Sequence, residues 1–174
     1  METLIITLAI IIVILVVLSF LLPENWSVKR STEVQSTPEK LYDLTVELKD
    51  WEKWSPWHGL DPNTKWVYSD NTYGEGAWYT WESKKRNVGN GKLTTVLAKP
   101  YEKSSFLLEF QGMKASTASF TFEPINANNV KVTWSLEGKN KGLSKLMSLL
   151  MGTFVRKDFE KGLANIKRVA ESGK

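Results

Sequence analysis

The chain has 174 residues, no cysteine and one histidine, which excludes disulfides, cysteine nucleophiles and cysteine-based zinc sites. One histidine also leaves too few imidazoles for a multi-histidine metal centre, so we predict neither a metal nor another cofactor. The net charge of +4 is only mildly basic, and we expect no nucleic-acid partner.

The N-terminal segment is apolar over a length that suits a membrane helix. Residues 4–22 hold no charge, and only Thr7 and Ser19 are polar. About 20 helical residues cross a hydrocarbon core of roughly 30 Å, and a helix satisfies its own backbone there. A cleaved signal peptide is the alternative, but no basic residue precedes the run and no small-residue cleavage site follows it. We therefore predict a retained anchor, residues 1–23, that contacts the membrane through residues 4–22.

The charges around this segment predict its orientation. No Lys or Arg precedes the span, whereas Lys29 and Arg30 follow it closely. The positive-inside tendency then makes the chain a single-pass protein of the cell membrane, with residues 24–174 as a cytoplasmic domain. Because the linker is only a few residues long, we expect this domain to lie close to the bilayer.

After the linker, the pattern changes to that of a folded domain. Residues 26–34 (WSVKRSTEV) alternate as a strand does. A helix follows, with Thr37 as its N-cap and Pro38 at its first position. Its apolar residues have helical spacing: Leu41, Leu44 and Leu48. Pro56 ends a second, shorter helix.

The next stretch, DWEKWSPWHGLD (residues 50–61), combines three tryptophans with the only histidine. Large aromatic side chains often line apolar pockets, and a histidine can act as an acid or a base. His58 has no cysteine partner, and the sequence alone identifies no serine and acid to complete a triad with it. A partly exposed loop histidine is therefore the favoured interpretation, with catalysis as the alternative.

Six further segments have the composition and spacing of strands. They are TKWVYS, AWYTWES, KLTTVLAKP, SSFLLEFQG, TASFTFEP and VKVTWSLEG. Short polar turns separate most of them, which implies antiparallel neighbours. Alternation places Glu82, Glu109 and Glu123 opposite the apolar face, so we expect these carboxylates in solvent.

The C-terminal part has the pattern of one long amphipathic helix. Apolar residues recur at i, i+3 and i+4 across residues 143–166. The opposite face is basic: Lys157, Lys161 and Arg168. Asp158 and Glu160 lie beside basic residues, and we expect surface ion pairs for both. The apolar stripe must pack against the apolar face of the sheet.

This order of elements, with several local strings, resembles the START-like, or SRPBCC, superfamily, in its bacterial polyketide cyclase/dehydrase-type branch. The strings are STPEKLYDLTVELKDWEKWSPW, GEGAWYTWES with the following VGNGKLT, FEPINANNVKVTWSLEG and DFEKGLANIK, and the resemblance covers residues 27–171. It implies the α+β helix-grip fold, in which a curved antiparallel sheet of about seven strands grips a long C-terminal helix around an apolar cavity. The N-terminal transmembrane helix is an addition to that fold.

The resemblance and the aromatic pattern together predict which side chains line the cavity. They are Trp54, Trp57, His58, Tyr79, Trp81, Phe110, Phe120, Trp134, Met147, Met151 and Phe154. In this arrangement Trp54 and Trp57 cap the mouth, and His58 is a polar group at the rim. A plain packed core is the alternative for about half of the set, since a domain of this size needs a core of that order.

Three functions follow, and we rank them by the residues that support each. The first is a membrane-anchored domain that binds a small hydrophobic or lipid-like ligand. The second is an enzyme of the polyketide cyclase or dehydrase type, with His58 and Tyr79 as the catalytic candidates, although no acid–base constellation supports it. The third is a module whose basic helix face docks on a membrane surface or a protein. Fold alone does not choose among them.

Overall fold

The computed structural model describes residues 1–172, with their side chains except those of residues 147–151 and 154. The helices are α1 (Glu2–Leu21), α2 (Pro38–Val46), α3 (Trp51–Trp54) and α4 (Lys145–Glu171), with short 3-10 turns η1 (Leu48–Asp50) and η2 (Gly142–Ser144). The strands are β1 (Asn25–Val34), β2 (Lys65–Tyr68), β3 (Trp78–Glu82), β4 (Asn90–Lys99), β5 (Lys103–Phe110), β6 (Ser116–Asn126) and β7 (Asn129–Lys139). This confirms the predicted α+β helix-grip fold.

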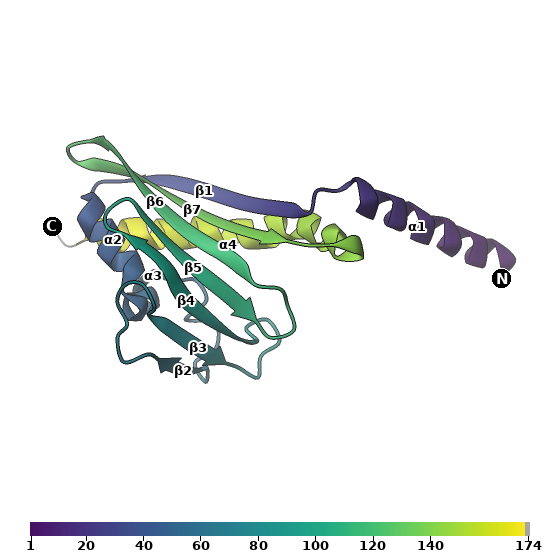
Figure 1. Ribbon diagram of the computed structural model, residues 1–174, viewed down its shortest axis with the longest axis horizontal. Helices are drawn as coiled ribbons and strands as arrows, with labels where there is room; N and C mark the ends of the chain where they lie inside the picture. The colour runs from purple at the N-terminus through teal and green to yellow at the C-terminus, as the bar shows by residue number, and fades with distance from the viewer. Residues whose placement is uncertain (173–174) are drawn as a thin grey trace.

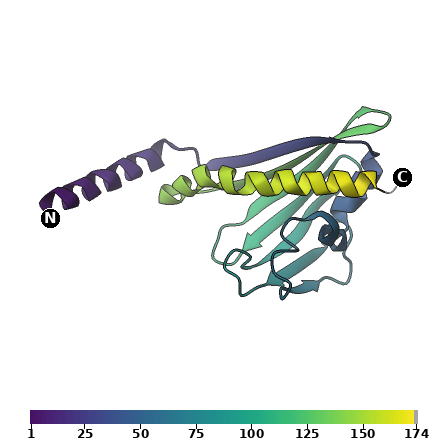
Figure 2. The ribbon, with the colours of Figure 1, turned by 180° about the vertical axis from the view of Figure 1, so that it is seen from behind.

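All seven strands form one antiparallel sheet in the order β1-β7-β6-β5-β4-β3-β2. The first and last strands are therefore neighbours, and the short β2 lies at the far edge. Figures 1 and 2 show α4 crossing one face of the sheet, with α2 and α3 beside its C-terminal half. The sheet and these three helices enclose the apolar interior.

Local sequence signals account for the elements around this interior. Thr37 caps α2 as predicted, because its hydroxyl accepts a hydrogen bond from the Lys40 N–H at 3.3 Å. Alternation in β7 is also confirmed, since its apolar side chains are buried: Val130, Val132, Trp134 and Leu136. The strand carboxylates predicted to face solvent are exposed: Glu82, Glu109 and Glu123.

An aromatic stack joins the sheet to α4. The ring of Trp134 on β7 lies parallel to that of Phe159 on α4, with centroids 4.0 Å apart and an interplanar angle of 5°. On the sheet side, Trp134 also stacks with Phe120 of β6 at 4.9 Å. Gly162 lies against the edge of the same indole, where a Cβ atom would come within 2.6 Å of the ring. Glycine therefore sets how closely α4 approaches the sheet.

Helix α1 extends away from the domain (Figure 1). Among residues 1–172, it is the one helix long and apolar enough to cross a membrane, although a signal sequence meets the same two criteria. Its C-terminal end packs against η2 and the start of α4. Lys145 Nζ donates a hydrogen bond to the Leu22 carbonyl at 3.0 Å, and Glu24 pairs with Lys139 at 3.2 Å.

Two glycine-to-alanine substitutions in α4 test the role of the close approach. In Gly162→Ala, the new methyl group must displace Trp134, so we expect the free energy of unfolding to fall by about 1–3 kcal/mol. Gly152→Ala is the matched control, because none of the described side chains from other elements comes within 4 Å of its Cβ position and alanine favours the helix by about 0.5–1 kcal/mol. Urea unfolding of both variants would contradict this role if Gly162→Ala were as stable as Gly152→Ala.

Candidate functional site

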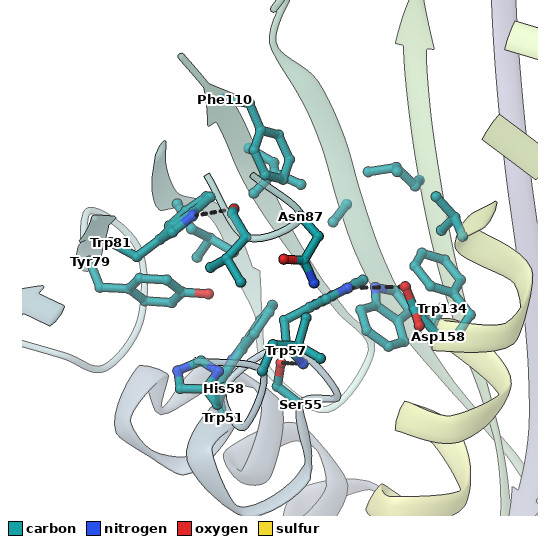
Figure 3. Close-up of a pocket in the computed structure, with 18 of the residues that line it drawn as sticks. Trp51, Ser55, Trp57, His58, Tyr79, Trp81, Asn87, Phe110, Trp134 and Asp158 are labelled. Atoms are coloured by element: carbon teal, nitrogen blue, oxygen red, sulfur yellow. Dashed lines mark hydrogen bonds between the residues drawn. The ribbon is translucent and has the colours of Figure 1, made fainter. Parts of the chain in front are cut away.

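A cavity of about 270 Å³ lies between the inner face of the sheet, the loop after α3 and the middle of α4. Its walls are almost entirely apolar and rich in aromatic rings (Figure 3). The cavity lies beside the Trp134–Phe159 stack, and both of these rings form part of its wall. The volume is near the lower end of the range of small-molecule sites, roughly 300–1,000 Å³.

Six of the predicted cavity residues lie in this wall. They are Trp57, His58, Tyr79, Trp81, Phe110 and Trp134. They come from the loop after α3 and from β3, β5 and β7, so residues that are distant in sequence converge on one space. Whether any of them binds a ligand stays a prediction.

Two other predicted residues lie outside the wall, in the packed core. Trp54 is fully buried, its indole N–H donates to the Leu44 carbonyl at 3.0 Å, and its ring packs on Phe120 at 5.6 Å. Phe120 is likewise fully buried. Trp54 is thus fixed beneath the cavity and does not cap its mouth, whereas Trp57 lines it. The predicted contacts Met147, Met151 and Phe154 lie outside the described side chains.

Several wall residues were not anticipated, for reasons that differ by location. Those on regular elements have the alternating or helical spacing of an inward-facing side: Trp51, Trp66, Leu93, Leu108, Ala118, Leu136, Val155 and Phe159. Those on loops carry no periodic signal: Ser55, Leu60, Asn87, Val88 and Met113. Tertiary structure alone places the second group at the cavity.

Asp158 corrects an expectation from the sequence. We expected a surface ion pair, as Glu160 indeed forms with Arg30 and Arg156 at 3.2 Å. The half-buried Asp158 instead lies in the cavity wall and accepts a hydrogen bond from the indole N–H of Trp57 at 3.1 Å (Figure 3). The bond ties the loop after α3 to α4 and fixes the ring of Trp57 across the cavity.

His58 is more enclosed than the rim position that we predicted. Its ring stacks on Trp66 with centroids 4.1 Å apart and an interplanar angle of 7°. Neither ring nitrogen is accessible to solvent, and neither has a hydrogen-bond partner among the described residues. This burial lowers the pKa of His58 from 6.5 to about 4, so the imidazole is neutral at physiological pH.

Tyr79 is the second polar group on this side of the cavity. Its ring is buried among His58, Trp66 and Trp81, and its hydroxyl points toward the middle of the cavity (Figure 3). Burial raises the pKa of the Tyr79 phenol far above its ordinary value, with a smaller contribution from the nearby Tyr68. At neutral pH, His58 and Tyr79 are therefore both uncharged and suited to hydrogen bonding. Among residues 1–172, no group of three or more His, Asp or Glu side chains could hold a metal ion.

Comparison with known proteins yields one family and a set of similar folds. The family described as "Polyketide cyclase / dehydrase and lipid transport" matches residues 25–171. A search of curated proteins finds no significant match.

Solved structures resemble the chain at low identity. Truncated norcoclaurine synthase from Thalictrum flavum is 10% identical, with a TM-score of 0.68 over 86% of this chain and 96% of that one. The same enzyme in complex with dopamine and hydroxybenzaldehyde is 12% identical, with a TM-score of 0.65 over 86% and 88%. A protein from Chromobacterium violaceum is 11% identical, with a TM-score of 0.60 over 84% and 98%. At these identities the likeness shows the fold alone.

The desolvated imidazole predicts how stability depends on pH. Between pH 6.5 and about 4, unfolded His58 binds a proton that the folded protein excludes. The free energy of unfolding should therefore decrease as the pH falls through this window, by about 2 kcal/mol after allowance for partial exposure. His58→Phe keeps an aromatic ring against Trp66 but cannot titrate, so the variant should lose this part of the dependence.

Urea unfolding in detergent micelles from about pH 7 to about pH 4.5 measures the difference between the two proteins. The carboxylates titrate equally in the native protein and in the variant, so their contribution cancels in the comparison. Identical slopes for the native protein and His58→Phe would show that the imidazole is not desolvated.

Proposed function

The chain belongs to the polyketide cyclase / dehydrase and lipid transport family, and on that premise we propose that its cavity binds a small apolar or amphipathic ligand, such as a lipid. We further propose that α1 anchors the domain, residues 24–174, in the cell membrane, with the domain on the cytoplasmic side. The observation that carries the first part is the aromatic-walled cavity of about 270 Å³. The exposed apolar surface of α1 supports the second.

The shape and lining of the cavity restrict the class of ligand. Burying apolar surface contributes about 25 cal/mol per Å², so a mostly apolar molecule gains most from these walls. The volume suits one acyl chain or one small ring system better than a lipid with two chains. The family description includes lipid transport, which is consistent with a single-chain amphiphile as cargo.

A few polar groups give the ligand an orientation. Tyr79 offers a hydroxyl, and Asn87 and Ser55 lie at the same cavity. Asp158 adds a carboxylate that Trp57 already holds in place. A ligand with one polar end and an apolar body matches this distribution, because isolated polar groups in apolar walls fix orientation more than they add affinity.

The enzymatic alternative has weaker support. Its candidates are His58 and Tyr79, whose rings are 5.8 Å apart. A base with a pKa of about 4 accepts protons poorly at neutral pH, and a phenol with a raised pKa donates them poorly. His58 and Tyr79 are therefore better suited to contacting a ligand than to transferring protons.

Filling the cavity should abolish binding. Ala118 is buried on β6 and lines the cavity, so Ala118→Phe places a ring where the ligand would lie. We expect the ligand that co-purifies with detergent-extracted protein, detected by native mass spectrometry, to decrease at least about tenfold. Ala164→Phe is the matched control, because Ala164 is exposed on α4. Equal ligand content in both variants, or an empty native protein, would contradict the proposal.

The anchor is tested on the full chain. A retained membrane helix should keep the protein in the membrane fraction after alkaline carbonate extraction. Its intact mass should remain that of the whole 19.8 kDa chain. Release into the soluble fraction, or a mass that lacks the N-terminal segment, would show that α1 is not an anchor.

A further inference from the structure

The strand register places α1 and the cavity mouth at the same end of the sheet. Trp26, near the start of β1, pairs with Gly138 of β7, which in turn pairs with Ser116 at the start of β6. The turn that leads into β6, residues 111–115, is therefore level with the point where α1 joins the domain. Figure 1 shows this turn and η2 on the side of the domain from which α1 leaves.

The cavity opens at this end. Three of its apolar wall residues are substantially exposed: Met113 in the β5–β6 turn (62%), Phe110 at the end of β5 (37%) and Leu60 in the loop before β2 (38%). Phe110 pairs with Gly91, and Gly91 with Trp81, so the β3–β4 turn is at the same end. We call Leu60, Phe110 and Met113 the mouth.

An exposed apolar side chain also lies beside the last turn of α1. Leu143 in η2 is 59% exposed, and η2 packs against α1. The bond from Lys145 to the Leu22 carbonyl and the Glu24–Lys139 pair hold this corner against the helix end. If α1 spans a bilayer, its last turn lies at the headgroup layer, and Leu143 lies there with it.

The two ends of the sheet differ in charge. At the α1 end, three connections (residues 83–89, 111–115 and 140–144) contain only basic charges: Lys84, Lys85, Arg86, Lys114 and Lys141. At the opposite end, the turns 69–77 and 100–102 contain only acidic charges: Asp70, Glu75 and Glu102. Two acids near the α1 end are paired, Asp61 with Lys85 and Glu24 with Lys139, and at the opposite end Glu102 is paired with Lys99. The end that carries the mouth thus complements an anionic lipid surface.

We propose that the mouth faces the lipid headgroups beside α1, so that an apolar ligand passes between the bilayer and the cavity without crossing bulk water. Exposed Met113 and Leu143 contact the lipid layer, and the basic turns around them hold anionic headgroups. The inference rests on the proposed anchoring by α1 and specifies where the ligand comes from. The opposite end of the sheet, with its acidic turns, faces away from the membrane.

The cysteine-free chain allows a direct test with single labels. Met113→Cys, Leu143→Cys and Ile125→Cys each carry one fluorophore on the full chain in vesicles with anionic lipid and a lipid-borne quencher. Ile125 is the matched control: it is 49% exposed and apolar, yet lies near the other end of β6, about 30 Å from Ser116 at about 3.4 Å per residue. We expect quenching at positions 113 and 143 to exceed that at 125 at least threefold.

A fourth label separates this inference from the anchoring itself. Ile11→Cys, in the middle of α1, reports whether the helix is inserted. Quenching at position 11 with equal quenching at 113, 143 and 125 would overturn the proposed orientation while leaving the anchor in place. No quenching at position 11 would overturn both. In vesicles without anionic lipid, quenching at 113 should fall; an unchanged value would show that the basic turns do not bind headgroups.

Discussion

The parallel stack of Trp134 on Phe159 is the contact on which the rest of the structure depends. It ties the middle of β7 to the middle of α4, and β7 in turn connects β1 to the other strands. Gly162 lets the helix approach closely enough for the rings to meet. Toward α2 and α3, the interior is filled by an aromatic cluster that includes Trp54 and Phe120, and Trp51 of this cluster also forms part of the cavity wall. Trp134 and Phe159 themselves line the cavity, so the stack lies where the packed core meets the cavity.

The fold was readable from the sequence because its signals are periodic. Alternation in β7 and the i, i+3, i+4 pattern of α4 name the faces that must meet, and Thr37 with Pro38 marks the start of α2. The cavity wall was only partly readable. Alternation identifies buried strand residues but cannot tell one in the packed core, such as Phe120, from one at the cavity, such as Trp134.

Contacts between a loop and a distant element could not be predicted from the sequence. Nothing in the residues around Asp158 indicates that its carboxylate meets the indole of Trp57, about a hundred positions earlier. The helix-grip resemblance put His58 at the rim of the cavity, yet the ring of Trp66 covers it. A stack of this kind depends on where β2 lies relative to the loop, which tertiary packing decides.

The contacts between the end of α1 and the domain connect the orientation of the helix to that of the domain. A hydrogen bond at Leu22 and an ion pair at Glu24 restrict the movement of the helix end relative to the domain. A membrane helix adjusts its tilt when its apolar length differs from the thickness of the bilayer. If α1 anchors the domain as proposed, a more tilted α1 in a thinner bilayer would turn the sheet with it and change the angle between the cavity and the lipid surface. The orientation of the cavity relative to the lipid surface would then depend on the thickness of the bilayer.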